Sequence, residues 1–227
     1  DEVKEDVKEL EEQELLAVFE MRKDTYVWHM DSIREAQQTL VRALEDYEKK
    51  YPYRYGMKKA EIQTMYFQKI KPNVFDRIVE FFVERGCIRR AEEFLCTPEF
   101  EVKKDGTYQK VAENFLNVFE KAGYDFVRYS EIDLKGVSRD MADDILNILL
   151  TEGKVVRVTE EMYTLAEYME QAKEKIKAHL AEDPLITIAQ VRDMFGTSRK
   201  SAKPILEYMD ALKITKKMGA ESERVAY

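Results

Sequence analysis

The chain has 227 residues, of which 44% are hydrophobic and 36% are charged, and its formal net charge is −8. This composition is typical of a globular protein with one or two ordinary domains or several small ones, and it excludes an intrinsically disordered chain. No apolar run approaches the roughly 20 residues that span a bilayer. Two cysteines cannot staple a chain of this length, so we expect a reducing, cytoplasmic setting.

No motif of a catalytic or metal-binding site occurs in the sequence. The two histidines, His29 and His179, are far apart, and the cysteines do not have the spacing of zinc ligands. Gly153-Lys154 lacks the upstream glycine of a phosphate-binding loop. Adjacent acids such as Asp143-Asp144 are common in a chain with 45 Asp and Glu residues, so they indicate a solvated helix face. We therefore expect no enzyme activity, metal or cofactor in this chain.

Residues 1–30 are interpreted as the C-terminal part of a first structural unit. Val3 and Val7 have the spacing of one helical face. Two runs rich in β-branched and aromatic residues follow, Leu15–Phe19 and Thr25–His29, and the polar segment between them predicts a hairpin.

Residues 31–104 are predicted to form a second unit of three helices and a hairpin. A long helix over Ser32–Lys49 precedes a shorter helix over Met57–Phe67. Asn73 can cap a third helix, and Gly86 ends it because glycine tolerates the left-handed backbone that follows a helix. The segment after this helix reads as a short hairpin.

Residues 105–165 repeat this order. A long helix is predicted over Tyr108–Ala122 and a short helix near Glu131–Lys135. Ser138 is expected to cap the third helix, and Gly153 is expected to end it. A hairpin then completes the third unit.

Residues 166–227 repeat the order once more. The run Thr187-Ile188-Ala189-Gln190 predicts a capping box for the short helix Ile188–Phe195. Pro204 falls near the start of the third helix. It is harmless there if Ser201 is the N-cap, because the missing N–H of proline then has no partner in the helix.

Three helices followed by a two-stranded hairpin define the winged-helix fold, a helix-turn-helix with a wing. The fold class is therefore mostly α with small β-hairpins (α+β), as tandem winged-helix domains. Each long helix follows the preceding hairpin after a few residues, so we expect an elongated, semi-rigid array. A soft joint is predicted at Lys103–Thr107.

The cations concentrate in the last unit. Residues Thr187–Tyr227 carry eight Lys and Arg against five Asp and Glu, a net charge of +3, whereas the other 186 residues carry −11. Arg199, Lys200 and Lys203 lie at the start of the third helix, where free backbone N–H groups favour phosphate. This pattern predicts a nucleic-acid contact at that helix start.

Further polar residues extend this candidate surface. Thr197 and Ser198 offer hydroxyl groups beside the helix start, and Lys216, Lys217 and Arg224 lie on the predicted wing. We expect helix start and wing to share one face. The corresponding helix starts in the second and third units carry acids that repel a phosphate backbone, so those units are expected to pack or to act as spacers.

Several stretches resemble a known family. The run Ile186–Lys200, which ends in Gly-Thr-Ser-Arg-Lys, and the run Pro204–Asp210, which begins Pro-Ile-Leu-Glu-Tyr, look like the last winged helix of the bacterial selenocysteine-specific elongation factors, the SelB family. Tyr51–Met57 is similar to the segment that opens the second winged helix of that family. The resemblance covers nearly the whole chain, and the middle units match by pattern only.

This resemblance implies a function and a domain division. In the family, four winged helices form the C-terminal region, and the last one binds an mRNA stem-loop that marks a UGA codon for selenocysteine. The chain is then a fragment with an incomplete first winged helix at 1–30 and complete ones at 31–104, 105–165 and 166–227. The GTPase domain, with its GTP and magnesium, lies outside it. The implied partners are the mRNA stem-loop and, through the full-length protein, the ribosome and selenocysteinyl-tRNA, with no membrane and a monomeric chain.

Carried over to this sequence, the family's RNA contacts are Ser198, Arg199 and Lys200 at the helix start and Lys217, Gly219 and Arg224 on the wing. With the charge pattern, the candidate RNA-binding residues are Arg192, Thr197, Ser198, Arg199, Lys200, Lys203, Lys216, Lys217, Gly219 and Arg224. The sequence departs from the family where Ser201 replaces an aromatic residue, Lys203 an apolar residue and Lys216-Lys217 an arginine pair. Lysine binds phosphate as a point charge, whereas arginine can also fork onto a guanine edge, which weakens the case for base reading by the wing.

Two other functions stay open. A winged-helix DNA-binding regulator would need a dimer and a long basic recognition helix, but Glu207 and Asp210 follow the cations here. A tandem winged-helix protein-interaction scaffold fits the acidic first three units. Binding to RNA or DNA should weaken steeply with salt, and a hydrophobic protein interface should not.

Overall fold

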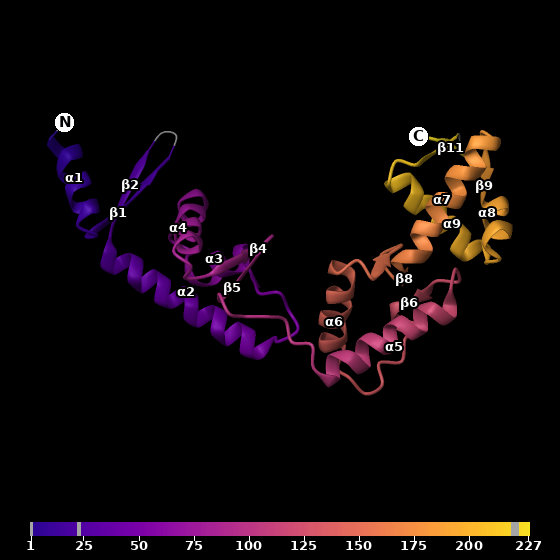
Figure 1. Cartoon of the computed structure of the whole chain (residues 1–227), viewed down its shortest axis with the longest axis horizontal. Coiled ribbons are helices and arrows are strands. Elements are labelled where there is room, and N and C mark those ends of the chain that lie inside the picture. Colours follow the sequence, from indigo (N-terminus) through magenta and orange to yellow (C-terminus); the bar gives the residue numbers. More distant parts are fainter. Residues whose placement is uncertain (1, 22–23, 219–222) are drawn as a thin grey trace. The chain divides into compact units, whose positions relative to one another are not determined.

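The computed structural model describes residues 2–21, 24–218 and 223–227, and the chain divides into two compact units, Asp1–Lys103 and Lys104–Tyr227 (Figure 1). Within these described ranges, no helix is both long enough and apolar enough to cross a membrane. The same residues hold no group of three or more His, Cys, Asp or Glu side chains arranged to bind a metal.

The first unit contains a helix and a hairpin, followed by three helices and a three-stranded antiparallel sheet in the order β3-β5-β4. Its elements are α1 (Glu2–Glu12), β1 (Leu16–Glu20), β2 (Thr25–His29), α2 (Met30–Lys50), β3 (Met57–Lys58), α3 (Lys59–Tyr66), α4 (Pro72–Glu84), β4 (Arg89–Ala91) and β5 (Phe94–Cys96). Met57 pairs with Leu95 across the sheet, so β3 is a third strand where the sequence predicted the beginning of a helix.

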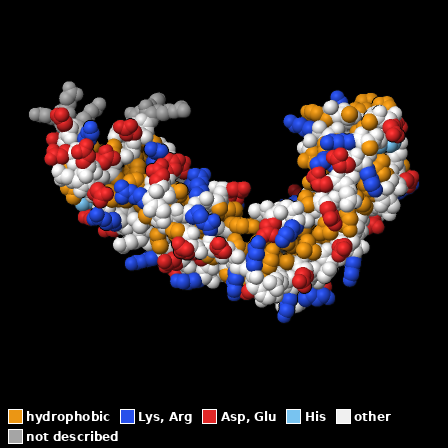
Figure 2. Space-filling model, in the orientation of Figure 1, with side chains coloured by type: hydrophobic (Ala, Val, Ile, Leu, Met, Phe, Trp, Pro, Cys, Tyr) orange, Lys and Arg blue, Asp and Glu red, His pale blue; other side chains and the backbone are white. Residues whose placement is uncertain are grey.

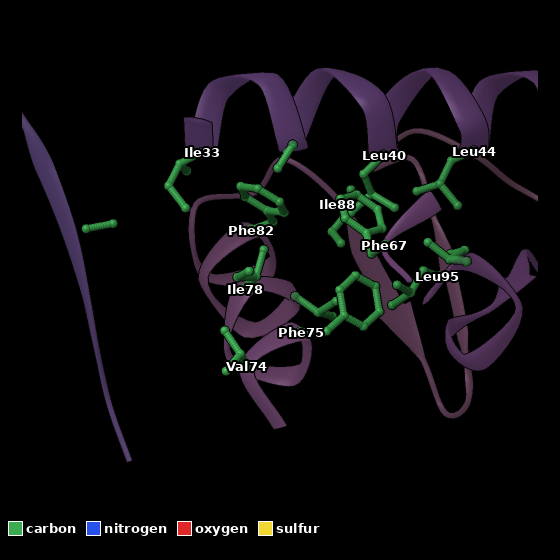
Figure 3. Packing of buried hydrophobic residues seen from close by; sticks show 14 of the residues in the cluster. Ile33, Leu40, Leu44, Phe67, Val74, Phe75, Ile78, Phe82, Ile88 and Leu95 are labelled. Atoms are coloured by element: carbon green, nitrogen blue, oxygen red, sulfur yellow. The ribbon is translucent and has the colours of Figure 1, made fainter. Parts of the chain in front are cut away.

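The core of the first unit lies between α2, α4 and β5. Leu40 of α2, Phe75 and Phe82 of α4 and Leu95 of β5 are fully buried and point toward one another (Figure 3). Phe75 and Phe82 are seven residues apart, which places them two helical turns apart on one face. Burying a side chain of this size contributes roughly 1.5–3 kcal/mol, so these residues fix how the helices of the unit pack.

The second unit contains two further copies of the same arrangement. The first copy comprises α5 (Gly106–Ala122), β6 (Val127–Arg128), the 3₁₀ turn η1 (Tyr129–Glu131), α6 (Arg139–Thr151), β7 (Val155–Arg157) and β8 (Met162–Leu165). The second copy comprises α7 (Ala166–Glu182), β9 (Ile186–Thr187), α8 (Ile188–Phe195), α9 (Arg199–Ala211), β10 (Thr215–Lys217) and β11 (Glu223–Ala226). Their sheets have the orders β6-β8-β7 and β10-β11-β9. Each wing hairpin thus again pairs with a short strand, which is β6 before η1 in the first copy and β9 before α8 in the second.

The two copies in the second unit share one buried cluster. Phe126 and Met162, from the first copy, lie in the same cluster as Ile186, Ile205 and Met209 of the second copy. All five side chains are at most 7% exposed. The α9 helix is therefore held by apolar contacts to both copies.

The predicted short helix near Glu131–Lys135 was wrong. Only the turn η1 forms, because the Asp133 side chain accepts a hydrogen bond from the backbone N–H of Lys135 at 2.9 Å. Lys135 and Gly136 then take positive φ values of 52° and 80°, a left-handed backbone that ends helical propagation.

Two predicted helix caps were also wrong. Lys71 is the N-cap of α4, and Pro72 takes the first helical position, where its missing N–H costs nothing. The N-cap of α9 is Ser198, so Pro204 lies inside the helix and cannot donate to the carbonyl oxygen of Lys200. The predicted Ser138 cap and the Thr187 capping box are confirmed.

Both ends of the predicted joint at Lys103–Thr107 are held by hydrogen bonds. The backbone N–H of Lys103 donates to the Pro52 carbonyl at 2.8 Å within the first unit. Asp105 caps α5 by accepting from the N–H groups of Thr107 and Tyr108, both at 3.0 Å. Residues 105–107 therefore belong to the start of α5, and flexibility of the remaining link stays a prediction.

Candidate nucleic-acid interface

The start of α9 presents three cations to solvent. Arg199, Lys200 and Lys203 are exposed, whereas Ala202 and Ile205 of the same helix are fully buried. This difference follows from the amphipathic spacing of the helix, which turns its apolar stripe inward. Lys203 is 3.4 Å from Glu207 one turn further on, so its charge is partly balanced.

Arg199 and Lys200 have no acidic partner among the described residues, in contrast to Arg192, Lys203 and Arg224. Neither forms an ion pair or a side-chain hydrogen bond with another described residue. Their positive charge is therefore available to a ligand. In contrast, Lys and Arg side chains are interspersed with Asp and Glu over much of the face shown in Figure 2.

A further arginine lies beside this helix start. Arg192 of α8 is exposed and pairs with its neighbour Asp193 at 2.7 Å. Arg192 and Arg199 line a small hollow of about 190 Å³, whose remaining walls are Ile188 and Ala189. The helix-turn-helix of the last copy thus brings two guanidinium groups to one apolar depression.

The hydroxyl groups at the helix start are engaged within the protein. Thr197 Oγ1 donates within the loop before β6, where the Tyr124 carbonyl oxygen is 2.8 Å away and Asp125 Oδ1 is 2.6 Å away. Ser201 Oγ accepts from the backbone N–H of Phe126 at 3.2 Å. Thr197 is 8% and Ser201 3% exposed. These two residues are buried and fasten the helix start to the preceding copy.

Ser198 is exposed, but its backbone N–H has a partner. It donates to Asp125 Oδ1 at 3.1 Å, and the Ser198 side chain makes no capping hydrogen bond to its own helix. The hydrogen bonds from Thr197 and Ser198 stabilise the ionised carboxylate and lower the pKa of Asp125 below its ordinary value. A carboxylate from another copy thus occupies a position where the sequence suggested a phosphate.

On the wing, two candidates are exposed and one is buried. Lys216 and Lys217 of β10 face solvent. Arg224 is 4% exposed, and its Nε lies 2.8 Å from Asp210 Oδ2 of α9. The other oxygen of Asp210 accepts from Thr215 Oγ1 at 2.6 Å. Arg224 therefore locks the wing to α9, and an RNA contact through its guanidinium would require this ion pair to break.

Apart from the buried Arg224, the predicted cations form two exposed groups. One group lies at the start of α9, and the other lies on the strand that follows its end. That they share one face stays a prediction, and Gly219 lies outside the described residues. No pattern in the sequence indicates the roles of Asp125 and Asp210, because both act on residues that only the fold brings near.

The start of α6 is the counterpart of this site in the preceding copy. Ser138 Oγ caps the helix by accepting from the Met141 N–H at 3.4 Å. The Arg139 guanidinium lies over the ring of Tyr129, 4.6 Å from its centroid, and Asp140 follows in the first turn. This helix start is therefore self-capped, and its arginine is packed on an aromatic ring.

Each copy combines helices with a three-stranded sheet that includes the wing hairpin, which defines a tandem winged-helix protein and confirms the predicted fold class. Two family models described as "Elongation factor SelB, winged helix" match the chain, that of the second winged helix at residues 41–95 and that of the third at residues 178–221. The chain therefore contains winged-helix domains of the SelB family, and the resemblance seen in the sequence is confirmed. The model named third matches the copy that the sequence analysis counted as fourth.

Curated relatives and a solved structure agree with this family. The chain is 23% identical over 78% of its length to a "Selenocysteine-specific elongation factor" of Desulfomicrobium baculatum, and 20% identical over 88% of its length to a protein of that name from Haemophilus influenzae. It spans 28% and 32% of the length of these two relatives. A solved bacterial selenocysteine-specific elongation factor EF-Sec shares the fold with a TM-score of 0.53 and 17% identity, covering 92% of this chain and 32% of that one.

Proposed function

We propose that this chain binds an mRNA stem-loop, the selenocysteine insertion element, through the start of α9. The observation that carries this proposal is the pair Arg199 and Lys200. Both are exposed, lack an acidic partner among the described residues, and lie in the segment that matches a SelB winged-helix model. The acidic balance of the rest of the chain makes this local positive charge distinctive.

The shape of the site suits the tip of a hairpin better than a helical stem. The major groove of an A-form RNA helix is too deep and narrow for an α-helix to read, so sequence is recognised at loops and bulges. A compact group of cations at one helix end matches an exposed loop. A DNA major groove is instead read along a recognition helix, and here Glu207 and Asp210 follow the first turn of α9.

The candidate residues take different parts in this proposal. Arg199 and Lys200 contact the RNA directly, and Arg192 extends the contact across the hollow beside α8. Lys203, Lys216 and Lys217 supply phosphate contacts, which give affinity but little sequence information. The supporting residues are Thr197, Ser198 and Arg224, whose hydrogen bonds and ion pair hold helix start and wing in place.

In the whole protein, this binding would tether a selenocysteine-specific elongation factor to its message during UGA recoding on the ribosome. Its relatives carry that name, and the chain covers about a third of their length. We propose that the winged-helix region has no catalysis of its own. GTP, magnesium and selenocysteinyl-tRNA would bind to other domains, in the cytoplasm.

The test compares two RNA hairpins that share a stem and differ in the loop. One carries a selenocysteine insertion loop and the other a replacement loop of the same length. We expect the native chain to prefer the first, and Arg199→Ala to cost roughly 1–3 kcal/mol of binding free energy. Arg139→Ala, the matched change at the start of α6, should leave binding within about twofold.

Salt dependence separates the competing functions. For RNA binding we expect the logarithm of the association constant to fall with the logarithm of salt by about 0.7–0.9 per phosphate contact. Equal binding of both loops, or tighter binding to a DNA duplex, would contradict the proposal. Binding with no salt dependence would indicate a protein-interaction scaffold.

A further inference from the structure

We infer that Asp125, in the copy that precedes the RNA-binding winged helix, is a positioning residue for RNA binding because it supports the start of α9 from outside. This inference rests on the proposed function and names a residue that neither the charge pattern nor the family resemblance singled out. The copy formed by α5–β8 then takes part in the RNA site without touching the RNA.

The N-cap serine of α9 does not cap its own helix. The Ser198 side chain makes no capping hydrogen bond, although serine is a favoured N-cap residue. Asp125 Oδ1 instead accepts from the Ser198 N–H at 3.1 Å and lies 2.6 Å from Thr197 Oγ1. A carboxylate that receives the N-cap N–H performs the part that Glu or Gln plays in a capping box. In this chain it comes from 73 residues earlier.

The loop that carries Asp125 is fixed against α8 and α9. Thr197 Oγ1 lies 2.8 Å from the Tyr124 carbonyl oxygen, and the Phe126 N–H donates to Ser201 Oγ. The Tyr124 ring lies 4.5 Å, centroid to centroid, from the ring of Phe195 at the end of α8. Phe126 is 5% exposed within the shared core. The loop and the helix start therefore form one packed contact.

The contact between this loop and α9 lies next to Arg199 and Lys200. These are the first two residues of α9, immediately after the supported N–H of Ser198. Without this support the first turn can fray, because the N–H groups at the very start of a helix have no partner inside it. Fraying would allow Arg199 and Lys200 many orientations. RNA binding would then have to order these side chains, and the loss of conformational entropy would weaken the affinity.

The position of Asp125 also limits how RNA can approach. Its carboxylate already occupies the N–H that a phosphate would seek at this helix start, and it adds negative charge there. A phosphate at this helix start is then left with the side chains of Arg199 and Lys200 and with the N–H groups of the first turn. Asp125 is itself exposed, and its substitution leaves the buried core intact, so variants at this position are expected to fold.

The experiment measures RNA affinity and amide hydrogen exchange for Asp125→Ala and Asp125→Asn in the full chain. Asparagine keeps an oxygen that accepts both hydrogen bonds, and alanine removes it. We expect Asp125→Ala to weaken binding of the matched hairpin roughly fivefold, as for loss of a helix cap, and to speed exchange at Ser198. Asp125→Asn should restore affinity to within about twofold of the native chain.

The control is Asp133→Ala, which removes another carboxylate of the same copy whose hydrogen bonds go to Lys135 and not to α9. It should leave RNA affinity unchanged. Tighter binding by both Asp125 variants would overturn the inference and assign Asp125 the part of a repelling charge. Unchanged affinity in both variants would overturn it as well. If the native chain shows no loop preference, the proposed function fails, and the exchange rates alone then show whether Asp125 supports the helix.

Discussion

The helices α6 and α9 begin with the same two residues, but these residues have different roles in the two helices. Both begin with Ser-Arg, at Ser138-Arg139 and at Ser198-Arg199. In α6 the serine caps its own helix, and the arginine packs over a tyrosine ring. In α9 the cap comes from Asp125, and the arginine is left to solvent beside Lys200. One motif in one fold can thus be used for packing or presented for binding, depending on the residues around it.

The largest expected effect comes from exchanging the third residue of the two helix starts. Lys200→Asp gives α9 the Ser-Arg-Asp start of α6. It removes a contact and adds a charge that repels phosphate, so we expect RNA affinity to fall on the order of 100-fold. Fluorescence anisotropy with the matched hairpin measures this loss.

The reciprocal change is the control. Asp140→Lys gives α6 a Ser-Arg-Lys start, but Arg139 stays over the ring of Tyr129. We expect no new preference for the matched loop and a gain in general RNA affinity of no more than about threefold. A loop-specific gain from Asp140→Lys would show that charge alone makes such a site, whatever caps the helix.

The second prediction separates two cations that face each other across the wing. Lys217 pairs in register with Arg224, yet Lys217 is exposed and Arg224 is buried against Asp210. Removing one partner of a buried ion pair leaves the other uncompensated, so Arg224→Ala should lower the free energy of unfolding by about 3 kcal/mol. Lys217→Ala should change it by no more than about 0.5 kcal/mol. Urea denaturation of both variants makes the comparison, and equal losses would contradict it.

The third prediction concerns the two serines. Ser138→Ala removes a capping acceptor and should cost about 1 kcal/mol of stability. Ser198→Ala removes a side chain that makes no capping bond, so it should cost only a few tenths of that amount. Thermal unfolding of the two single variants tests this order. A larger loss of stability for Ser198→Ala than for Ser138→Ala would contradict this prediction.

The smallest expected effect is a dependence on pH. The folded-state pKa of Asp125 lies below its ordinary value of 3.8 because Thr197 and Ser198 donate to the carboxylate. The carboxylate therefore stabilises the fold above pH 3.8 and loses this contribution as the pH falls through the lower, folded-state pKa. The stability difference between the native chain and Asp125→Asn should be constant near neutral pH and shrink in acid. A stability difference that grows as the pH falls would contradict this prediction.

The sequence predicted the elements with strong local signals. The long helices, the Thr187 capping box and the repeated helix-hairpin order follow from apolar spacing and from cap residues a few positions away. The two-residue strands β3, β6 and β9 were missed, because a strand of that length has no period and forms only when the wing pairs with it. The short helix predicted near Glu131–Lys135 does not form, because a local turn at Asp133 competes with helix formation.

The residues of the candidate site also divide into those that local sequence patterns predict and those that depend on distant partners. Charge and spacing located the exposed cations at the start of α9, because those features are local. The burial of Arg224 depends on Asp210, 14 residues away, and the support of Ser198 depends on Asp125, 73 residues away. Neither distance leaves a pattern in one sequence. A basic residue can therefore be recognised from sequence, but whether its charge is free is decided by the fold.

The most direct test of the account is a map of amide hydrogen exchange with and without the matched RNA hairpin. The central claim is that the α9 start contacts RNA and the α6 start does not. We predict slower exchange on RNA addition at residues 198–203 and unchanged exchange at residues 139–144. Protection at residues 139–144, or none at 198–203, would contradict the claim.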